Sequence, residues 1–535
     1  PLMPLTEMPQ LSCDEPADRI VISGRDFELI FSKTTGTIAA LVYEGQALIR
    51  DEEGRVNGPI LNAFRAPVNN DKYCSGGWRQ AGLDALRREV RYVTVDKDNP
   101  RAVTIETLVE SHGKNDCRFD LYTTWSVLGN GCINVSSRIV PHAAPNILPR
   151  IGLRMALPAE HDTFTWFGRG PHENYADRKT GADVGLYHSS VAEQFVPYVD
   201  TQETGNKEDV RWAALTDDGG AGLLVVAGSQ ICVTALHYTA QELAAARHPV
   251  ELPERDEVIL CLDYAQNGLG GASCGPPPMD KYLLRPQPIV FTFSLRPYVP
   301  ATGPLPEVAR RQVPIAPRVG IRRDEAGLVT LACEHERARI QYSTDGSDPR
   351  ANGRLYTEPF DFADGGTVRA VALGEGLIPS PISSETYGLL IPRSEVKVIY
   401  ADSEHPGEGE AYKAIDGRPD TYWHSKWGRG EPKHPHELRI DLGGQYELTG
   451  FTYLPRQDSR NGRIADYELY LSADGKNWSL PASTGRFPNT AERQTVMFDR
   501  PIAARFIRLV ARSEVAGHAW TSVAELDVIA AKRFK

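Results

Sequence analysis

Three side chains that could exchange protons, His172, Glu173 and Asp177, lie with Arg178 in one short Gly- and Pro-rich segment. Histidines and carboxylates are the groups that enzymes use most often as general acids and bases. The same residues also suit a structural role, because carboxylates paired with arginine hold turns in place. The pair Arg65 and Asp71 poses the same choice. In both places the sequence favours the structural interpretation, and we predict no catalytic residue.

The cysteines and two aspartates give weaker signals. The chain has eight cysteines, and no two of them have the Cys-x-x-Cys spacing of a metal or redox site. They are interpreted as free thiols, while disulfides stay open because pairing depends on geometry. Asp345 and Asp348 could suggest calcium, but turn formation by their side chains explains them more simply.

Length and charge limit the function classes. The 535 residues exceed the roughly 250–300 at which a single core stops growing, so several domains are expected. A net charge of −11 argues against a nucleic-acid surface, because phosphates require basic patches. No stretch approaches the ~20 apolar residues that cross a bilayer, so we predict no membrane-spanning segment.

The elements that must position these side chains are mostly strands. Only Leu83, Leu86 and Val90 follow helical spacing, whereas short apolar runs that end in turn residues recur along the chain. Strands are expected at residues 27–31, 222–226, 340–344, 367–373, 467–471 and 506–511. The predicted fold class is therefore all-β.

Proline-rich breaks divide the chain into modules. We predict linkers at residues 1–19 and 299–316, and modules at 20–298, 317–389 and 394–531. Module sizes of this order are ordinary for domains. Sandwiches of β-sheets fit all three modules.

The first module carries several long motifs in a fixed order. Residues 64–71 read Phe-Arg-Ala-Pro-Val-Asn-Asn-Asp, residues 168–178 read Gly-Arg-Gly-Pro-His-Glu-Asn-Tyr-Ala-Asp-Arg, and Tyr198, 202–206 and 211–212 follow. This series resembles the small-chain domain of family 2 β-galactosidases. The resemblance implies a β-supersandwich that follows the catalytic barrel in the intact enzyme. The sequence departs from the family pattern at Asn69 and over 201–205, where local hydrogen bonding is expected to differ.

The same resemblance singles out one loop, residues 267–278. In the family this loop reaches across to the sugar site of the barrel, and a relative places a stacking tryptophan in it. Asn267, Ser273 and Cys274 are therefore predicted to lie next to the substrate in the whole enzyme. Cys274 takes the position of the tryptophan, and because a thiol has little stacking face, its contact with sugar is expected to be weaker.

The catalytic pair of a retaining galactosidase is not expected in this chain. Such an enzyme needs two carboxyls about 5–5.5 Å apart, and in family 2 both are glutamates of the barrel, one of which follows an asparagine. No Asn-Glu dipeptide occurs in the 535 residues. The chain begins Pro1–Leu2–Met3 and is interpreted as a piece of a longer protein, so a missing signal peptide says nothing about location. Alone, it is expected to be inactive.

The second module has a recognisable strand and turn. Residues 340–349 read Ile-Gln-Tyr-Ser-Thr-Asp-Gly-Ser-Asp-Pro, and Tyr356, Pro359, 368–372 and Ser380 follow. The segment resembles the small C-terminal domain of chitobiases and β-hexosaminidases, which implies an immunoglobulin- or fibronectin-like sandwich. A spacer is the predicted role.

The third module resembles another family. Residues 414–427 read Ala-Ile-Asp-Gly-Arg-Pro-Asp-Thr-Tyr-Trp-His-Ser-Lys-Trp, and further matching blocks lie at 454–458, 461–464, 507–509 and 524–526. They resemble a discoidin (factor V/VIII C-type) domain, close to family 32 carbohydrate-binding modules, which implies a jelly-roll (galactose-binding-like) sandwich. Many members hold a structural calcium ion. The matching oxygen donors here are Asp416, Thr421 and Glu525, with nearby backbone carbonyls. Alternatively, Asp416 only caps a turn.

The discoidin resemblance also implies a sugar site. The predicted carbohydrate-binding residues are His424, Trp427, Arg456, Asn461 and Trp520. Galactose-binding relatives use a histidine, an arginine and an asparagine for sugar hydroxyls, and aromatic rings stack on the apolar sugar face. As an alternative, Arg456 pairs with Asp458 and His424 is an ordinary loop histidine.

Together these inferences predict the accessory C-terminal part of a retaining β-galactosidase that hydrolyses terminal β-D-galactosides. Its partners would be galactose-containing glycans and the missing catalytic barrel of the same polypeptide. One alternative is a free-standing carbohydrate-binding or adhesion protein, and another is a structural module set whose discoidin domain has lost its ligand. A periplasmic or extracellular location is expected, because a sugar-binding module is most useful on a polymer outside the cell.

Overall fold

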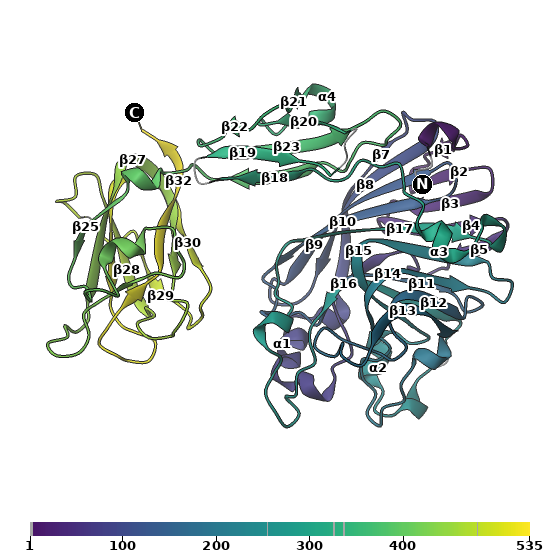
Figure 1. The fold of residues 1–535 in the computed structure, drawn as a ribbon, viewed down its shortest axis with the longest axis horizontal. Coiled ribbons are helices and arrows are strands. Elements are labelled where there is room, and N and C mark those ends of the chain that lie inside the picture. The colour runs from purple at the N-terminus through teal and green to yellow at the C-terminus, as the bar shows by residue number, and fades with distance from the viewer. Residues whose placement is uncertain (1–3, 254, 325–326, 335–337, 479, 535) are drawn as a thin grey trace. The chain divides into compact units, whose positions relative to one another are not determined.

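The computed structural model describes residues 4–253, 255–324, 327–334, 338–478 and 480–534. The chain forms two compact units, Pro1–Ile315 with Gly376–Ile378 (unit 1) and Ala316–Glu375 with Pro379–Lys535 (unit 2). Strands make up most of the regular structure in both (Figure 1), which confirms the predicted all-β class. Over the described residues, no helix has both the length and the apolar composition needed to cross a membrane.

Unit 1 contains a small antiparallel sheet at its N-terminal end. Its strands follow one another in sequence order: β1 (Ser12–Asp14), β2 (Arg19–Ser23), β3 (Phe27–Ser32), β4 (Thr37–Tyr43) and β5 (Gln46–Ile49). In β3, the residues Phe27, Leu29 and Phe31 are buried and alternate with more exposed ones. This period of two is expected for a sheet with one face against a core.

A much larger twelve-stranded sheet forms the body of unit 1. Its main path runs β13 (Asp183–Ser190), β12 (Thr163–Gly170), β14 (Lys207–Thr216), β15 (Gly222–Leu236), β17 (Ile289–Tyr298), β10 (Ile133–His142), β9 (Arg118–Leu128), β8 (Ala102–His112) and β7 (Arg87–Asp96). Off this path, β16 (Glu257–Gln266) pairs with β15 and β11 (Arg150–Pro158), and β6 (Ile60–Asn62) pairs with β11.

One hydrophobic core joins the two sheets of unit 1. It includes Ile20, Leu29 and Phe31 from the small sheet and Trp125 and Leu295 from the large one, all nearly inaccessible to solvent. Phe31 and Trp125 meet edge to face, with ring centroids 5.5 Å apart. The small sheet therefore folds onto the large sheet, because each has one face that must leave water.

Helices are short and lie in the connections: α1 (Ser75–Gln80), α2 (Ala240–Ala245), α3 (Leu305–Ala309) and α4 (Pro349–Asn352). The helical spacing of Leu83, Leu86 and Val90 does not form an α-helix. Leu83 belongs to a 3-10 turn, η3 (Leu83–Ala85), and Val90 lies in β7, opposite Val109 of β8. Pairing with β8 over ten residues outweighs a local periodicity that only three residues support.

Unit 2 begins with two facing antiparallel sheets. One contains β18 (Gly320–Arg323), β19 (Leu328–Ala332) and β22 (Phe360–Asp361), and the other contains β21 (Arg354–Leu355), β20 (Arg339–Ser343), β23 (Gly366–Leu373) and β24 (Ser383–Tyr387). Tyr342 of one sheet stacks on Phe360 of the other at 4.3 Å between ring centroids. These two sheets form the small sandwich that the sequence predicts for the second module.

The rest of unit 2 is the third module (Figure 1), here called the third sandwich. Its strands are β25 (Lys397–Ala401), β27 (His436–Leu454), β28 (Asp466–Ser472), β29 (Ser483–Arg486), β30 (Gln494–Ala511) and β32 (Glu525–Arg533), with a separate pair β26 (Trp423–His424) and β31 (Ser522–Val523). Register shifts interrupt the long pairing of β27 with β30 at two places. Such irregularities bend strands, and they let one connected sheet enclose a common core.

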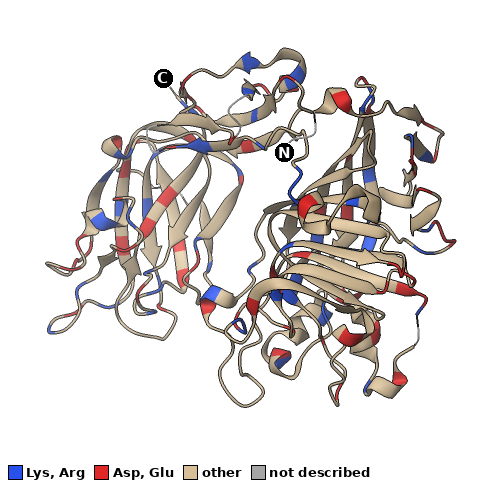
Figure 2. Cartoon of the chain, turned by 45° about the vertical axis from the view of Figure 1, so that its right-hand side comes forward, with Lys and Arg blue, Asp and Glu red and all other residues tan. Residues whose placement is uncertain are grey.

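Basic and acidic residues are interspersed along the strands of both units (Figure 2). All six strands predicted from sequence are present, four of them within one or two residues of the expected bounds. The segments 222–226 and 506–511 are parts of the longer strands β15 and β30.

Candidate carbohydrate-binding site

The short ladder of β26 and β31 carries the first predicted sugar-binding residue. His424 faces Ser522 across this ladder. The neighbouring Trp423 is 1% exposed in the core of the third sandwich, and its indole N–H donates to the backbone oxygen of Ser403 at 2.9 Å. Because successive side chains of a strand point to opposite faces, the burial of Trp423 directs His424 away from that core.

His424 is held as a neutral acceptor. Its Nδ1 lies 2.7 Å from the backbone oxygen of Ser425, and because a carbonyl only accepts, Nδ1 must carry the proton. Burial, reinforced by the positive charge of Arg456, lowers the pKa of His424 from 6.5 to about 4. Nε2 has no partner among the described residues. At neutral pH it can therefore accept a hydrogen bond from a sugar hydroxyl.

Arg456, just after β27, is fixed by two neighbours. Its Nε and Nη2 donate to Asp458, the latter at 2.9 Å, and its guanidinium carbon lies 4.0 Å from the centroid of the Tyr422 ring. The alternative pairing with Asp458 is thus present. It does not use Nη1, for which the described part of the chain supplies no acceptor. Arg456 can therefore pair with Asp458 and still donate to a ligand.

Trp427 is half-buried beside His424. One face of its indole stacks on His405, with centroids 3.2 Å apart and planes 10° apart. The His424 ring stands nearly perpendicular to it, at 4.5 Å. A sugar ring could stack only on the indole face opposite His405. We call His424, Trp427 and Arg456 the sugar cluster.

Two further predicted residues lie on flanking loops. The backbone oxygen of Asn461 accepts from the Ser522 hydroxyl at 2.9 Å, which fastens its loop to the ladder. The side chain of Asn461 is exposed. Trp520 stacks on His518 at 4.7 Å between centroids. Among the described residues, no hydrogen bond or ring contact links the side chains of Asn461 or Trp520 to the sugar cluster.

Two positioning residues, Tyr422 and His405, were not predicted from the sequence. Tyr422 contacts Arg456 and lies 6.3 Å from the His424 ring, so it connects these two members of the cluster. An aromatic residue directly before Trp423 and His424 was a visible signal for it. No sequence pattern indicated His405, because this residue meets Trp427 only in the folded chain.

The predicted calcium ligands lie at the start of the third sandwich. The Thr421 hydroxyl donates to both carboxylate oxygens of Asp416, at 2.8 and 2.9 Å. Asp416 also accepts from the backbone N–H of Arg418 at 2.9 Å, so it does cap a turn. The alternative role is therefore observed, and it leaves the calcium role open.

Glu525 on β32 supplies the third predicted ligand. Its side chain is 1% exposed, and its Oε1 is buried with no hydrogen-bond partner among the described residues. The other oxygen accepts from Arg393 at 3.0 Å, and the same guanidinium donates to the backbone oxygen of Ile415 at 2.9 Å. An unsatisfied buried carboxylate oxygen close to the loop of Asp416 is compatible with a cation such as calcium.

In unit 1, two family-type motifs hold the loop 267–278, here called the anchored loop. In the first motif, Asn70 accepts a hydrogen bond from the backbone N–H of Ser273 and donates one to the backbone oxygen of Gly270, both at 2.9 Å. Lys72, directly after this motif, donates to the backbone oxygen of Ser273 at 2.6 Å. From the second motif, Asp177 accepts from the N–H groups of Leu269 and Gly270 at 2.9 and 2.7 Å. The base of the loop is thereby fixed from two sides.

The three predicted substrate-adjacent residues differ in exposure. Asn267 is 0% exposed, and its amide donates to the Tyr73 hydroxyl at 2.9 Å and accepts from the N–H of Leu284 at 3.0 Å. Its amide is therefore committed inside the protein. Ser273 and Cys274 are exposed at the tip, and they are the side chains that a partner could reach.

The acid–base interpretation of the second motif finds no support. Glu173 accepts from the N–H of Gly205 at 2.7 Å, from the Thr204 hydroxyl at 3.1 Å and from the Tyr198 hydroxyl. Arg65 and Asp71 form a fully buried ion pair at 2.7 Å. These carboxylates are occupied in holding backbone and loops, as the structural interpretation expects. All eight cysteines are free in the structure.

Three known families match three different segments of the chain. Residues 23–295, more than half of the chain, match the family described as β-galactosidase small chain. The chain belongs to this family. Residues 398–526 match the F5/8 type C domain, and residues 329–387 match the Fn3 associated family. The small-chain and discoidin resemblances are thereby confirmed.

Several known proteins share parts of the chain. A β-galactosidase of Priestia megaterium is 35% identical over 269 residues, which are 49% of this chain and 25% of the relative. A sialidase of Micromonospora viridifaciens is 39% identical over 175 residues, 32% of this chain and 26% of the relative. A solved family 32 CBM from Clostridium perfringens NanJ, in complex with galactose, is 35% identical over 26% of this chain and 96% of its own, with a TM-score of 0.24. The chain spans about a quarter of the length of the curated relatives it matches.

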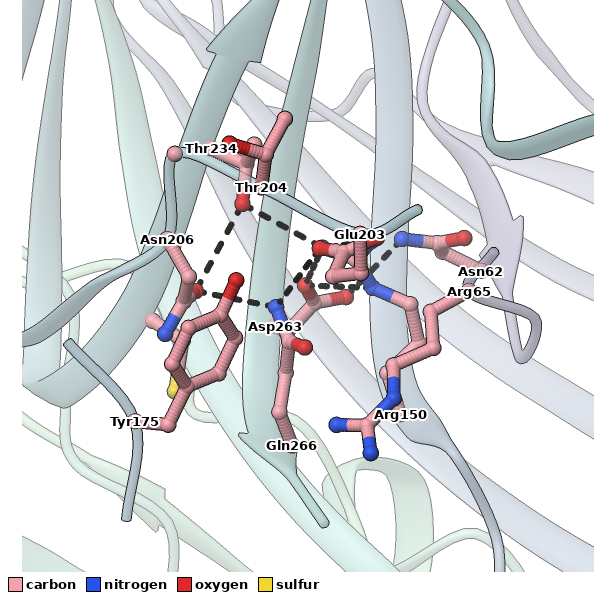
Figure 3. A network of polar contacts seen from close by, with 12 residues as sticks. Asn62, Arg65, Arg150, Tyr175, Glu203, Thr204, Asn206, Thr234, Asp263 and Gln266 are labelled. Carbon is pink, nitrogen blue, oxygen red and sulfur yellow. Dashed lines mark hydrogen bonds and ion pairs between the residues drawn. The ribbon is translucent and has the colours of Figure 1, made fainter. Parts of the chain in front are cut away.

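The small-chain domain is held together by a buried polar network (Figure 3). Arg150 of β11 donates to Asp263 of β16 at 2.9 Å and to Glu203 at 3.1 Å, and all three side chains are at most 2% exposed. Asn62 donates to Asp263 at 3.0 Å, and Gln266 donates to Glu203 at 3.3 Å. One guanidinium thus neutralises two buried carboxylates and links β6, β11, β16 and the segment 202–206.

Proposed function

We propose that this chain is the accessory part of a retaining β-galactosidase that hydrolyses terminal β-D-galactosides. In this proposal the small-chain domain supports an active site whose two catalytic carboxyls belong to a barrel elsewhere in the parent protein. The third sandwich binds galactose-like glycans, and the parent protein works in the periplasm or outside the cell. Membership of the small-chain family and the β-galactosidases among the relatives support this assignment.

The observation that carries the binding role is the composition of the sugar cluster. It combines an acceptor at His424 Nε2, donors at Arg456 Nη1 and an aromatic face at Trp427. Sugars offer hydroxyls that both donate and accept, together with an apolar face for an aromatic ring. The side chains are held by backbone and ring contacts before any ligand arrives, and this lowers the entropy cost of binding.

The anchored loop supports the second role. Ser273 and Cys274 project from a base that is pinned by Asn70 and Asp177. A loop presented in this way can contribute to a pocket that another domain completes. In the proposal, this loop faces the sugar held by the barrel.

Replacement of Arg456 by alanine tests the binding role. We expect the intact 535-residue chain to bind methyl β-galactoside or lactose in isothermal titration calorimetry. Loss of a charged donor typically removes about 1.5–3 kcal/mol, so Arg456→Ala should bind roughly ten- to a hundredfold more weakly.

Arg486→Ala is the matched control, because Arg486 is an exposed arginine on the same sandwich that pairs with Asp466 at 3.1 Å. It should bind like the wild type. Equal affinity of Arg456→Ala and wild type would remove Arg456 from the site. No galactoside binding by the wild type would refute the binding role itself.

We also propose a structural calcium ion in the third sandwich. Asp416, Thr421 and Glu525 would hold it through oxygen atoms, and the buried Oε1 of Glu525 would gain a partner. The ion would tie the loop of Asp416 to strand β32 and so stabilise the fold. Arg393 contacts the same carboxylate and would have to share or yield it.

Calcium addition and a Glu525→Gln variant test this site. A calcium concentration ten times the dissociation constant should stabilise the EDTA-treated wild type by about 1.4 kcal/mol, seen as a raised melting temperature. Equilibrium dialysis should find one ion per chain. The Glu525→Gln chain should lose both effects. The same calcium response in the two chains would contradict the assignment.

A further inference from the structure

A cavity of about 490 Å³ lies in unit 1 and borders the buried network of Figure 3 only through Asn62. It is bordered by β6, β11 and β16, by η3, and by facing residues of β7 and β8. Its volume is in the range of small-molecule sites, which are ≈300–1,000 Å³. None of the roles derived so far uses it.

The lining of this cavity is strongly basic for a chain of net charge −11. Its ionisable residues are Arg55, Arg88, Arg154, Arg255, Asp84 and Glu257. Two of the arginines are neutralised locally, since Arg55 and Arg255 both bond to Glu257. Arg55 also pairs with Glu52 at 3.0 Å, and Arg255 pairs with Glu242 at 2.8 Å. Both oxygens of Glu257 are thus engaged by Arg55 and Arg255, and Glu257 forms no ion pair with the other two arginines in the described structure.

Arg88 and Arg154 have no acceptor in the part of the chain that the structure describes. Nη1 of Arg88 is buried without a hydrogen-bond partner. The two guanidiniums lie close enough to affect each other. Burial, and after it the charge of Arg154, lowers the pKa of Arg88. Both arginines are half-buried. Partial withdrawal from water disfavours a charged group unless an anion lies nearby, and neither guanidinium has a carboxylate partner among the described residues.

A third polar group without a partner completes the arrangement. Ser111 of β8 lies directly opposite Arg88 of β7 in the strand register. Its side chain is 0% exposed, and its hydroxyl has no hydrogen-bond partner among the described residues. On the other side, Arg154 of β11 pairs with Ile60 of β6. Strand pairing thus brings Arg88 and Ser111 together, and Arg154 lines the same cavity from β11.

We propose that this cavity is a binding site for a small ligand that carries an oxyanion group, either a carboxylate or a sulfate or phosphate. Arg88 and Arg154 would donate charged hydrogen bonds to the oxyanion, and the Ser111 hydroxyl would donate a third. Guanidinium groups match these planar or tetrahedral oxyanions geometrically. This site is separate from the sugar cluster and from the proposed calcium site.

Binding is tested on the intact chain by calorimetry with three probes: sodium sulfate, inorganic phosphate and sodium galacturonate, each against sodium chloride of equal ionic strength. We expect at least one oxyanion to bind with one site per chain. Arg88→Met and Arg154→Met should each weaken that binding at least tenfold. Binding of galacturonate alone identifies an acidic sugar as the ligand, whereas binding of sulfate or phosphate identifies a tetrahedral anion.

Folding serves as the second readout. Without anion, Arg154→Met should melt at or above the wild-type temperature, because it removes a half-buried charge that forms no ion pair among the described residues. The bound oxyanion should raise the melting temperature of the wild type and not that of the variant. Arg19→Met, at an exposed pair with Asp18, is the control and should keep wild-type anion binding. Unchanged binding in both cavity variants, or no binding of any probe by the wild type, overturns the proposal. Arg456→Ala should retain anion binding, so failure here is separable from failure of the galactoside site.

Discussion

Replacing Arg150 by methionine is expected to lower the free energy of unfolding of unit 1 by about 3–5 kcal/mol. Arg150 neutralises Glu203 and Asp263, and none of the three side chains is more than 2% exposed. Methionine fills similar space but leaves Asp263 without its ion-pair partner and Glu203 with only the charge of Arg65 nearby. This loss is large because marginal domains have only about 5–15 kcal/mol of stability.

Urea unfolding followed by tryptophan fluorescence measures the loss, since unit 1 contains the buried Trp125 and Trp166. Arg19→Met makes the same change at an exposed ion pair with Asp18, where the expected loss is much smaller because solvent screens the two charges. Adding Glu203→Gln and Asp263→Asn to Arg150→Met removes the stranded charges and should recover part of the stability. A similar small effect of Arg150→Met and Arg19→Met would show that the network is not what holds β11 to β16.

Acidification from pH 6.5 to pH 4 is expected to destabilise the third sandwich through His424. In the folded protein the pKa of His424 is lowered to about 4, first by burial and then by the charge of Arg456. In the unfolded chain it titrates near its ordinary value, about 6.5. Between pH 6.5 and 4 the unfolded state therefore binds a proton at His424 that the folded state does not bind. The free energy of unfolding falls as the pH drops, and this contribution of His424 is fully lost below pH 4. A difference of this size corresponds to roughly 3 kcal/mol.

Melting curves of wild type and His424→Gln between pH 4 and 7.5 isolate this contribution. Two other histidines of this sandwich have shifted pKa values: burial lowers the pKa of His434, whereas the pKa of His436 is raised because its hydrogen bonds to Asp402 and Ala519 and the charge of Asp402 together outweigh burial. Their effects cancel in the difference between the two chains. The variant should lose less stability on acidification, and His188→Gln, at an exposed strand position of unit 1, should follow the wild type. Parallel curves for wild type and His424→Gln would contradict the neutral, buried histidine.

The same neutral state matters for the proposed ligand. A protonated His424 would have no acceptor to offer a sugar hydroxyl, because both ring nitrogens would carry hydrogen. Between pH 5 and 8 the lowered pKa keeps His424 an acceptor. Arg456 contributes to this state by charge, and it contributes donors of its own. The two residues therefore act as a complementary pair through Tyr422, which contacts both.

Much of this protein followed from its sequence alone. The alternation in β3, β20 and β28 predicts strands because side chains on a sheet repeat every two residues. The motifs at 64–71 and 168–178 indicate the small-chain family because many residues recur in order. Residue types also indicated that Glu173 and Asp177 are structural, and the structure shows each accepting backbone N–H groups.

Other features were decided only by the tertiary structure. The segment with helical spacing at Leu83, Leu86 and Val90 becomes a turn and a strand, because β8 is available as a partner. The stacking of His405 on Trp427 could not be seen either, since residues distant in sequence meet there only through the fold. Likewise, no local pattern shows that Arg150 pairs with two carboxylates while Arg154, on the same strand, forms no ion pair within the part of the chain that the structure describes. The spacing of apolar residues along the chain indicates where strands form. Which charged side chains meet depends on which strands become neighbours in the folded sheet. For this reason the family and candidate sugar-binding residues can be predicted from the sequence, whereas the cavity lined by Arg88 and Arg154 can be found only in the folded chain.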